Sequence, residues 1–342
     1  MKAEQSRRTL AIWLFAVCGL IALMVVVGGL TRLTGSGLSI TEWKPIHGAL
    51  PPLSLEEWQE EFDAYRQIPQ YQLINKGMSL DEFKAIFWWE WGHRNLGRLI
   101  GMAFLIPFLV FWFRGQVERP LVPRLIVLFI LGGLQGFMGW YMVASGLTER
   151  VDVSQYRLVA HLGLALVIYA AIFMTALPLW RSEWPARRDP HPLYRWSHIV
   201  TALIFVQILL GGFVAGTDAG LTYNTWPLMD EAIIPAGAWA SDPVWRAPFE
   251  DVTTIQFNHR MMGYAVFLAV IALVIAGLRQ GLTAWKRTAG WLLLGACVLQ
   301  VAIGIWTLIA VMPIWLAAMH QFGAVVLLTA ALLHVDALRT RS

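Results

Sequence analysis

Four of the eight histidines lie near one end of a long hydrophobic segment, an unusual place for an ionisable side chain. They are His93, His161, His259 and His320. An ionisable residue inside a membrane-spanning segment is energetically costly and marks a candidate functional site. A single such histidine more often forms a hydrogen bond between helices. Four of them, arranged as two pairs along the chain, favour ligation of a metal or cofactor.

The residues around these histidines favour haem over zinc as the ligand. No HExxH motif or other zinc spacing occurs, and no carboxylate or thiolate completes a tetrahedral shell. Two imidazoles from facing helices, surrounded by apolar side chains, suit the axial positions of a haem iron. Arg94 and Arg260 each follow a histidine directly and could pair with haem propionates. An equally good explanation of their positions is that each arginine side chain extends its charged end to the membrane–water interface.

One carboxylate distinguishes the first histidine from its counterpart. Glu90 lies three residues before His93, whereas Gln256 lies three residues before His259. Residues at this spacing share one face of a helix. A carboxylate there can move a proton, position a water molecule or stabilise a positive intermediate, and glutamine cannot do the proton chemistry. We therefore expect Glu90 to act in catalysis; the alternative is that it caps the start of its helix.

The elements that position these residues are membrane helices. The chain has 342 residues, of which 57% are hydrophobic and only 14% are charged, so lipid must solvate much of it. A crossing needs roughly 20 apolar residues. Eight segments meet this requirement, and they lie near residues 10–30, 88–113, 122–143, 158–180, 198–216, 255–278, 288–310 and 315–337. The sequence therefore predicts an all-α integral membrane protein with eight transmembrane helices.

Other features of the composition exclude some functions. Cys18 and Cys297 stand alone in hydrophobic runs, without a CxxC or CxxCH motif, so we expect small buried side chains rather than a thiolate site. No patch of basic residues interleaved with aromatic residues occurs, and we expect no nucleic-acid partner. The expected surroundings are the lipid bilayer.

Charge sets the expected orientation in the membrane. The termini and the short loops on one side hold 15 Lys and Arg residues against five acidic ones, whereas the long loops 31–87 and 217–254 are rich in Glu and Asp. Basic loops stay on the cytoplasmic side. We therefore expect both termini in the cytoplasm and the long loops outside.

The sequence also repeats itself in order. The recurring landmarks are Gly28-Gly29, Gly37 and Trp43 (offset 183), His93-Arg94 and Gly97 (offset 166), Gln135 and Gly139 (offset 165), and His161 with His320 (offset 159). Because four crossings return the chain to the side on which it began, two successive units of four helices have the same orientation in the membrane. This order predicts two pseudo-symmetric four-helix bundles, an N-terminal half at 1–190 and a C-terminal half at 191–342.

Several longer motifs resemble a known family. They are the stretches Gly37-Leu38-Ser39, Glu42-Trp43-Lys44-Pro45, Leu50-Pro51-Pro52-Leu53, Ile86-Phe87-Trp88-Trp89-Glu90-Trp91-Gly92-His93-Arg94, Phe257-Asn258-His259-Arg260 and Met319-His320-Gln321. On these motifs the chain resembles the haem A synthases of proteobacteria and mitochondria over nearly its whole length. It lacks the paired outer-loop cysteines of another branch of that family.

The resemblance implies a function and a role for each candidate residue. The expected reaction oxidises the C8 methyl of haem O to a formyl group, by successive hydroxylations, and gives haem A for terminal oxidases. His93 and His161 would flank the substrate haem in the N-terminal half, with Glu90 as the essential acidic residue. His259 and His320 would ligate a resident haem b in the C-terminal half. A haem with two histidine ligands is saturated and would transfer electrons.

The resemblance also implies partners and a location. We expect haem O as substrate, which would enter sideways from the bilayer, and the inner membrane of a bacterial cell as the location. The prenyltransferase that makes haem O and an electron donor are further candidate partners. Two other functions stay open from the residues alone: a dihaem b-type electron carrier, and a haem transporter or chaperone.

Overall fold

The computed structural model describes residues 2–44, 47–148, 150–181 and 189–340. Five residues counted in the motifs and loop charges above lie outside this part: Pro45, Glu183, Arg187, Arg188 and Arg341. The described residues form helices and no β-strand longer than an isolated bridge. The all-α prediction is therefore confirmed.

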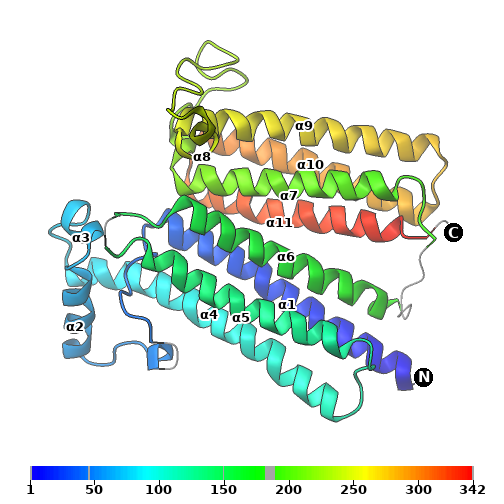
Figure 1. Ribbon diagram of the computed structural model, residues 1–342, viewed down its shortest axis with the longest axis horizontal. Coiled ribbons are helices and arrows are strands. Elements are labelled where there is room, and N and C mark those ends of the chain that lie inside the picture. Colours follow the sequence, from blue (N-terminus) through cyan, green and yellow to red (C-terminus); the bar gives the residue numbers. More distant parts are fainter. Residues whose placement is uncertain (1, 45–46, 149, 182–188, 341–342) are drawn as a thin grey trace. The chain divides into compact units, whose positions relative to one another are not determined.

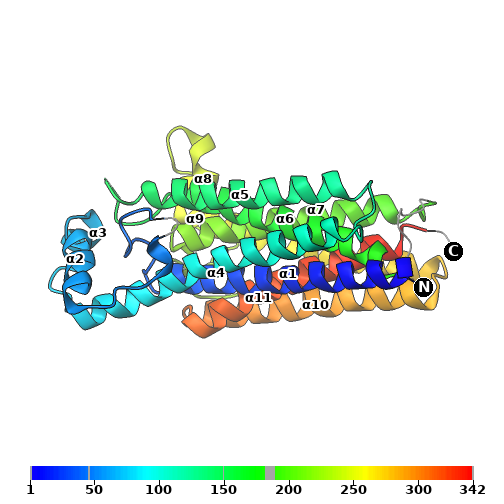
Figure 2. The same ribbon diagram turned by 90° about the horizontal axis from the view of Figure 1, so that it is seen from below.

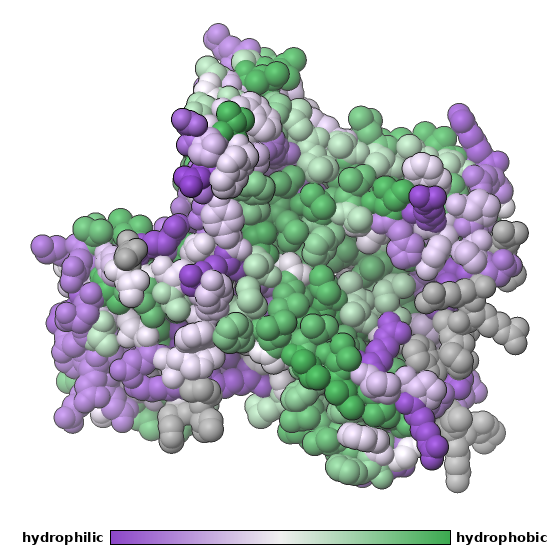
Figure 3. All heavy atoms as spheres, in the orientation of Figure 1, coloured by the Kyte–Doolittle hydropathy of each residue, from purple (hydrophilic) through white to green (hydrophobic). Residues whose placement is uncertain are grey.

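Eight helices in the described part of the chain are long and apolar enough to cross a membrane. They are α1 (Lys2–Leu33), α4 (Leu80–Phe113), α5 (Val122–Ala144), α6 (Gln155–Trp180), α7 (Tyr194–Gly216), α9 (Val252–Arg279), α10 (Ala284–Ile309) and α11 (Ile314–Ala337). Hydrophobic side chains cover the middle of these helices in Figure 3, and hydrophilic ones gather near their ends. The predicted number of membrane helices is confirmed, and the chain is a multi-pass membrane protein.

The chain forms two compact units. One comprises residues 16–169, and the other comprises residues 1–15 with 170–342, so that α1 and α6 contribute to both. Each pair of candidate histidines lies within a single unit: His93 and His161 in the first, His259 and His320 in the second. The pseudo-symmetry of two halves divided at residue 190 stays a prediction.

In the second unit, α7, α9, α10 and α11 form a four-helix bundle. Neighbouring backbones approach closely around the bundle, from α7 to α9, α10, α11 and back to α7, and the four helices run side by side in Figures 1 and 2. Buried aliphatic side chains fill the centre, among them Ile204, Val270, Leu293 and Leu327. Cys297 lies in this core as a free thiol, as expected from its hydrophobic context.

In the first unit, the loop after α1 carries structure that the hydropathy pattern did not predict. The short helices α2 (Leu55–Tyr65) and α3 (Pro69–Leu73) occur in this loop, and α2 lies across the start of α4 in Figure 2. The Phe62 ring stacks on Phe83 with centroids 4.9 Å apart. Both belong to a buried cluster with Leu38, Tyr65 and Phe87. This cluster attaches the outer loop to α4.

The helix α4 begins eight residues earlier than predicted. Ser79 caps it: its hydroxyl accepts from the backbone N–H of Glu82 at 3.3 Å, and the Glu82 carboxylate accepts from the backbone N–H of Ser79 at 2.8 Å. This capping box satisfies two backbone donors that the helix itself leaves free. The residues Glu90 to Arg94 therefore lie well inside a helix rather than near its first turn.

Three further turns of helix lie in the loop between α7 and α9. They are the 3₁₀ turns η2 (Ala219–Leu221) and η3 (Val244–Arg246) and the four-residue α8 (Ala247–Glu250); a third 3₁₀ turn, η1 (His47–Ala49), lies in the first outer loop. Asp251 caps α9, and its carboxylate accepts from the backbone N–H of Thr254 at 2.6 Å. His259 thus lies in the second turn of a capped helix.

Candidate functional site

The two histidines of the second unit face each other. The ring centroids of His259 in α9 and His320 in α11 are 6.5 Å apart, with an interplanar angle of 83°. Two imidazoles on opposite sides of one metal, each at a metal–nitrogen distance of about 2 Å, have centroids roughly 6–6.5 Å apart. The pair therefore has the spacing that axial ligation of one iron requires.

The two histidines of the first unit are also brought together. His93 in α4 lies close enough to His161 in α6 for their charged forms to interact. Both rings are partly buried. All four histidines selected from the sequence thus occur as two pairs, one in each unit.

Each of the four histidine rings lies against a glycine of the preceding membrane helix. A Cβ atom built on that glycine would approach the ring more closely than an ordinary van der Waals contact. The distances from this Cβ are 3.1 Å from Gly28 to His93, 3.1 Å from Gly139 to His161, 3.2 Å from Gly211 to His259 and 2.6 Å from Gly304 to His320. A side chain at Gly304 would therefore force the His320 ring to move, and at the other three of these glycine cradles it would press on the ring by a few tenths of an ångström.

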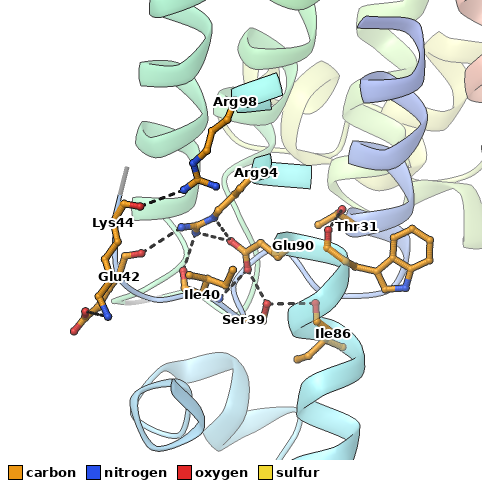
Figure 4. Close-up of polar contacts among 10 residues, drawn as sticks. Thr31, Ser39, Ile40, Glu42, Lys44, Ile86, Glu90, Arg94 and Arg98 are labelled. Carbon is orange, nitrogen blue, oxygen red and sulfur yellow. Dashed lines mark hydrogen bonds and ion pairs between the residues drawn. The ribbon is translucent and has the colours of Figure 1, made fainter. Parts of the chain in front are cut away.

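Glu90 is buried, with 2% of its surface exposed. One carboxylate oxygen accepts from the Ser39 hydroxyl and from the Ile40 backbone N–H, each at 2.8 Å. The other accepts from Nε and Nη2 of Arg94 at 3.0 and 2.6 Å. Figure 4 shows these donors converging on Glu90 from α4 and from the loop after α1. Four donors match the acceptor capacity of a carboxylate.

This geometry excludes helix capping as the role of Glu90. The cap of α4 is Ser79, and Glu90 lies about three turns further along the helix. Its i, i+3 position relative to His93 places both residues on one face of α4. Glu90 therefore lies beside a candidate ligand and is fixed by the outer loop.

The two candidate arginines hold the outer loops in the same way. Arg94 Nη2 donates to the carbonyl of Ile40 at 2.8 Å and Nη1 to that of Glu42 at 3.2 Å. Arg260 Nη2 donates to the carbonyl of Tyr223 at 2.8 Å, 183 residues after Ile40. The repeat thus extends to loop contacts that the sequence analysis did not identify.

The environments of the two arginines differ in charge. Arg94 pairs with Glu90, whereas Arg260 makes no ion pair within the described part of the chain and its Nε is buried without a partner. Gln256, at the place of Glu90, donates to the Tyr223 carbonyl at 2.9 Å. An additional anion would therefore find an uncompensated guanidinium only at Arg260. Pairing of either arginine with a propionate stays a prediction.

The loop beside Arg94 is further anchored to α4. Arg98 Nη2 donates to the carbonyl of Lys44 at 3.2 Å, as Figure 4 also shows. A hydrogen bond to Glu42 raises the pKa of Lys44, which keeps this exposed lysine charged. A cavity of about 80 Å³ borders Arg94, Trp43 and Trp140. A small group approaching from this side would reach the guanidinium of Arg94.

Two kinds of contact were missed from the sequence. Ser39 belongs to a matched motif, but nothing in the sequence showed that its hydroxyl reaches Glu90. Glutamines on the preceding helices donate to the backbone carbonyls of three histidines: Gln135 to His161 at 3.0 Å, Gln207 to His259 at 3.0 Å and Gln300 to His320 at 2.9 Å. The recurrence of Gln135 as Gln300 was visible, but its role was not.

Comparisons with known proteins agree with the resemblance. The model of the COX15-CtaA family, described as cytochrome oxidase assembly protein, matches residues 11–332. The haem A synthase of Parvibaculum lavamentivorans is 56% identical over 98% of this chain and 96% of its own length. Those of Azorhizobium caulinodans and Nitrosomonas eutropha are 51% and 49% identical, over 98% and 97% of this chain and 95% and 94% of their own lengths.

The glycine cradles give a direct test of the histidine sites. In Gly304→Ala the new methyl group must displace the His320 ring, and overpacking of this kind costs about 1–3 kcal/mol. We expect the haem content of the purified protein, measured as pyridine haemochrome per polypeptide, to fall about tenfold. The control is Gly295→Ala on the same helix, where a Cβ meets no atom within 4 Å. Equal haem content in the two variants would rule out His320 as a ligand.

Proposed function

The chain belongs to the COX15-CtaA family of cytochrome oxidase assembly proteins, and on this basis we propose that it is a haem A synthase. It is an oxidoreductase that converts haem O to haem A. Its full-length relatives carry this function, which favours it over the electron carrier and the transporter that the residues alone left open. One observation makes the assignment specific: two histidine pairs occur, and only one has a carboxylate beside it.

The second unit is proposed to hold a resident haem b between His259 and His320. The fit rests on the 6.5 Å separation of the two rings, on the glycine cradles, and on the buried Nε of Arg260, which lacks a partner. When bound, such a haem would supply electron transfer. The imidazoles of His259 and His320 would hold it, and Arg260 would attract its propionates.

The first unit is proposed to bind the substrate, haem O, between His93 and His161. The backbones of its membrane helices approach one another less closely than those of the α7–α9–α10–α11 bundle; α4 and α5 come closest. A site between more widely spaced helices suits a ligand that enters from the bilayer and leaves again. The reaction would take the C8 methyl to an alcohol and then to a gem-diol that loses water.

Glu90 is proposed to act as a fixed negative charge near the reacting methyl group. With O2 as the oxidant, each of the two oxidations would insert one oxygen atom into a C–H bond of the methyl carbon, while two electrons from the donor and two protons reduce the other oxygen atom to water; positive charge develops on the carbon as its C–H electrons are withdrawn. Each of the two carboxylate oxygens of Glu90 accepts two hydrogen bonds. A carboxylate held in this way is preorganised to stabilise the positive charge. Of the three roles considered for Glu90, this arrangement favours cation stabilisation over proton transfer or positioning of water.

We further propose that the protein resides in the inner membrane of a bacterial cell with both termini in the cytoplasm. The excess of Lys and Arg in the loops on one side supports this orientation. The prenyltransferase that supplies haem O and a membrane electron donor are its proposed partners. The reaction requires a source of haem O, and with O2 as the oxidant it also requires a donor that delivers two electrons for each oxygen atom inserted.

Replacing Glu90 with glutamine tests its role in the reaction. Glu90→Gln keeps the shape of the side chain but removes its charge. Loss of one preorganised electrostatic contact costs about 10²–10³-fold in rate. We expect pigments extracted from cells to shift from haem A to haem O or its hydroxylated intermediate, as separated by reversed-phase chromatography.

The control for this variant is Glu82→Gln, the same change at the exposed cap of the same helix. It should leave the ratio of haem A to haem O unchanged. A normal yield of haem A in Glu90→Gln would remove Glu90 from the mechanism without affecting the assignment of the haem sites.

Cysteine labelling tests the proposed orientation. The native Cys18 and Cys297 are buried, so background labelling should be low. We expect a membrane-impermeant maleimide to label Glu56→Cys, in α2, in spheroplasts. It should label Arg119→Cys, between α4 and α5, only in inverted vesicles. The opposite pattern would reverse the topology.

A further inference from the structure

Three of the four histidines accept a hydrogen bond from a glutamine of the preceding membrane helix. The same glutamine also contacts the imidazole ring. Gln207 Nε2 lies 3.2 Å from Nδ1 of His259, and Gln300 Nε2 lies 3.2 Å from Nδ1 of His320. Gln135 Nε2 lies 3.4 Å from Nε2 of His161. Each glutamine thus contacts both the ring and the backbone carbonyl of its histidine.

The glutamines occupy equivalent places on their helices. Each lies four residues before the glycine that cradles the same histidine, so amide and glycine share one helix face. The sets are Gln135 with Gly139, Gln207 with Gly211, and Gln300 with Gly304. The pattern of a glutamine, three residues and a glycine therefore accompanies three of the four histidines.

At the fourth histidine the residue in this place is methionine. Met24 lies four residues before Gly28, and 183 residues before Gln207. The side-chain ends of the two residues reach matching places. The Met24 methyl lies 3.5 Å from a Cβ at Gly97, and Gln207 Nε2 lies 3.4 Å from a Cβ at Gly263. Both glycines lie four residues after their histidine.

The two side chains differ in what they offer an imidazole. A carboxamide donates through Nε2 and accepts through Oε1, whereas a thioether donates nothing and accepts weakly. The Oε1 atoms of all three glutamines are buried without a hydrogen-bond partner. In the structure the donor Nε2 faces the ring, so a metal-bound imidazole donates its other ring N–H to Oε1 once the carboxamide turns over, and that bond fixes the ring and its tautomer. Within the described residues, the His93 ring makes no hydrogen bond.

We propose that Gln135, Gln207 and Gln300 are positioning residues that fix three haem-ligating imidazoles, and that Met24 leaves His93 as the unrestrained ligand. This inference rests on the proposed function. The second unit then has two fixed imidazoles, which suits a haem that stays bound through many turnovers. The first has one fixed and one free imidazole, which suits a porphyrin that must leave after oxidation. Methionine at position 24 thus distinguishes the site that exchanges its haem from the site with glutamine at position 207, which retains its haem.

Exchanging the two residue types tests this proposal. The purified full-length protein is mixed with excess apomyoglobin as haem acceptor, and the pigments released over time are identified by chromatography. In Gln207→Met we expect release of haem b to accelerate about 10–100-fold, the usual effect of losing such a partner. The low-spin EPR signal of this haem should also shift, because the orientation of the His259 ring is no longer fixed.

The reverse change provides an independent arm. Met24→Gln adds the missing amide, and we expect release of haem O or haem A from the first unit to slow about tenfold. Met24→Leu, which changes the same side chain without adding an amide, is the matched control and should release these pigments as the wild type does. This arm decides the question if Gln207→Met does not accumulate as folded protein.

The outcomes separate this inference from the proposed function. Folded Gln207→Met with wild-type release and EPR signal, or Met24→Gln that behaves as Met24→Leu, would overturn the positioning role alone. A wild-type protein that contains no haem at all would overturn both. A fall in thermal stability without a change in release or EPR signal would assign the glutamines to packing and would also overturn the proposal.

Discussion

An imidazole between membrane helices must find its polar partners within the protein, because lipid offers none and an unpaired polar group there costs several kcal/mol. For His161, His259 and His320 the preceding helix supplies the partner. It can do so because a glycine lets its backbone come within contact of the histidine ring, at Gly139, Gly211 and Gly304 as at Gly28. Close approach places the residue four positions earlier beside the same ring. The spacing of each helix pair, the orientation of its histidine and the room left for a ligand all follow from this contact.

The same architecture gives two different electrostatic environments. Beside His93, the charges of Glu90 and Arg94 compensate each other in a buried ion pair at 2.6 Å. Beside His259, neutral Gln256 replaces the acid, and the positive charge of Arg260 stays without a counter-ion among the described residues. An anionic group such as a propionate is therefore attracted more strongly at Arg260, which favours retention of a haem there. The Glu90 carboxylate is held by its four donors one helical turn from His93, where substrate oxidation is proposed.

Hydropathy and charge predicted the membrane helices well, because lipid imposes a length and a composition that are read directly from the sequence. The start of α4 was missed by eight residues, since residues 80–87 are too polar to count as a membrane crossing. The Ser79–Glu82 capping box, and a similar pair at Ser54 and Glu57 before α2, were the signals available.

The histidines and Glu90 were found from residue type and spacing. Ser39 and Ile40 were not, because contacts across about 50 residues depend on how the loop closes.

That loop closure connects the outer segment to the chemistry. Leu38 is 1% exposed and packs with Phe62, Tyr65 and Phe83 in the aromatic cluster between α2 and α4. The next two residues, Ser39 and Ile40, supply half of the donors to Glu90. Burial of large aromatic side chains provides the free energy that orders this segment, and the order is transmitted through the backbone to the carboxylate. In the second unit the stretch from Trp226 to His259, which contains Gln256, is 17 residues shorter than the stretch from Trp43 to His93. The additional length in the first unit contains α2 and α3, so the structural difference between the two outer loops coincides with the one site that carries an acid. The cluster around Phe62 and Phe83 therefore orders the backbone that supplies two of the four donors to Glu90.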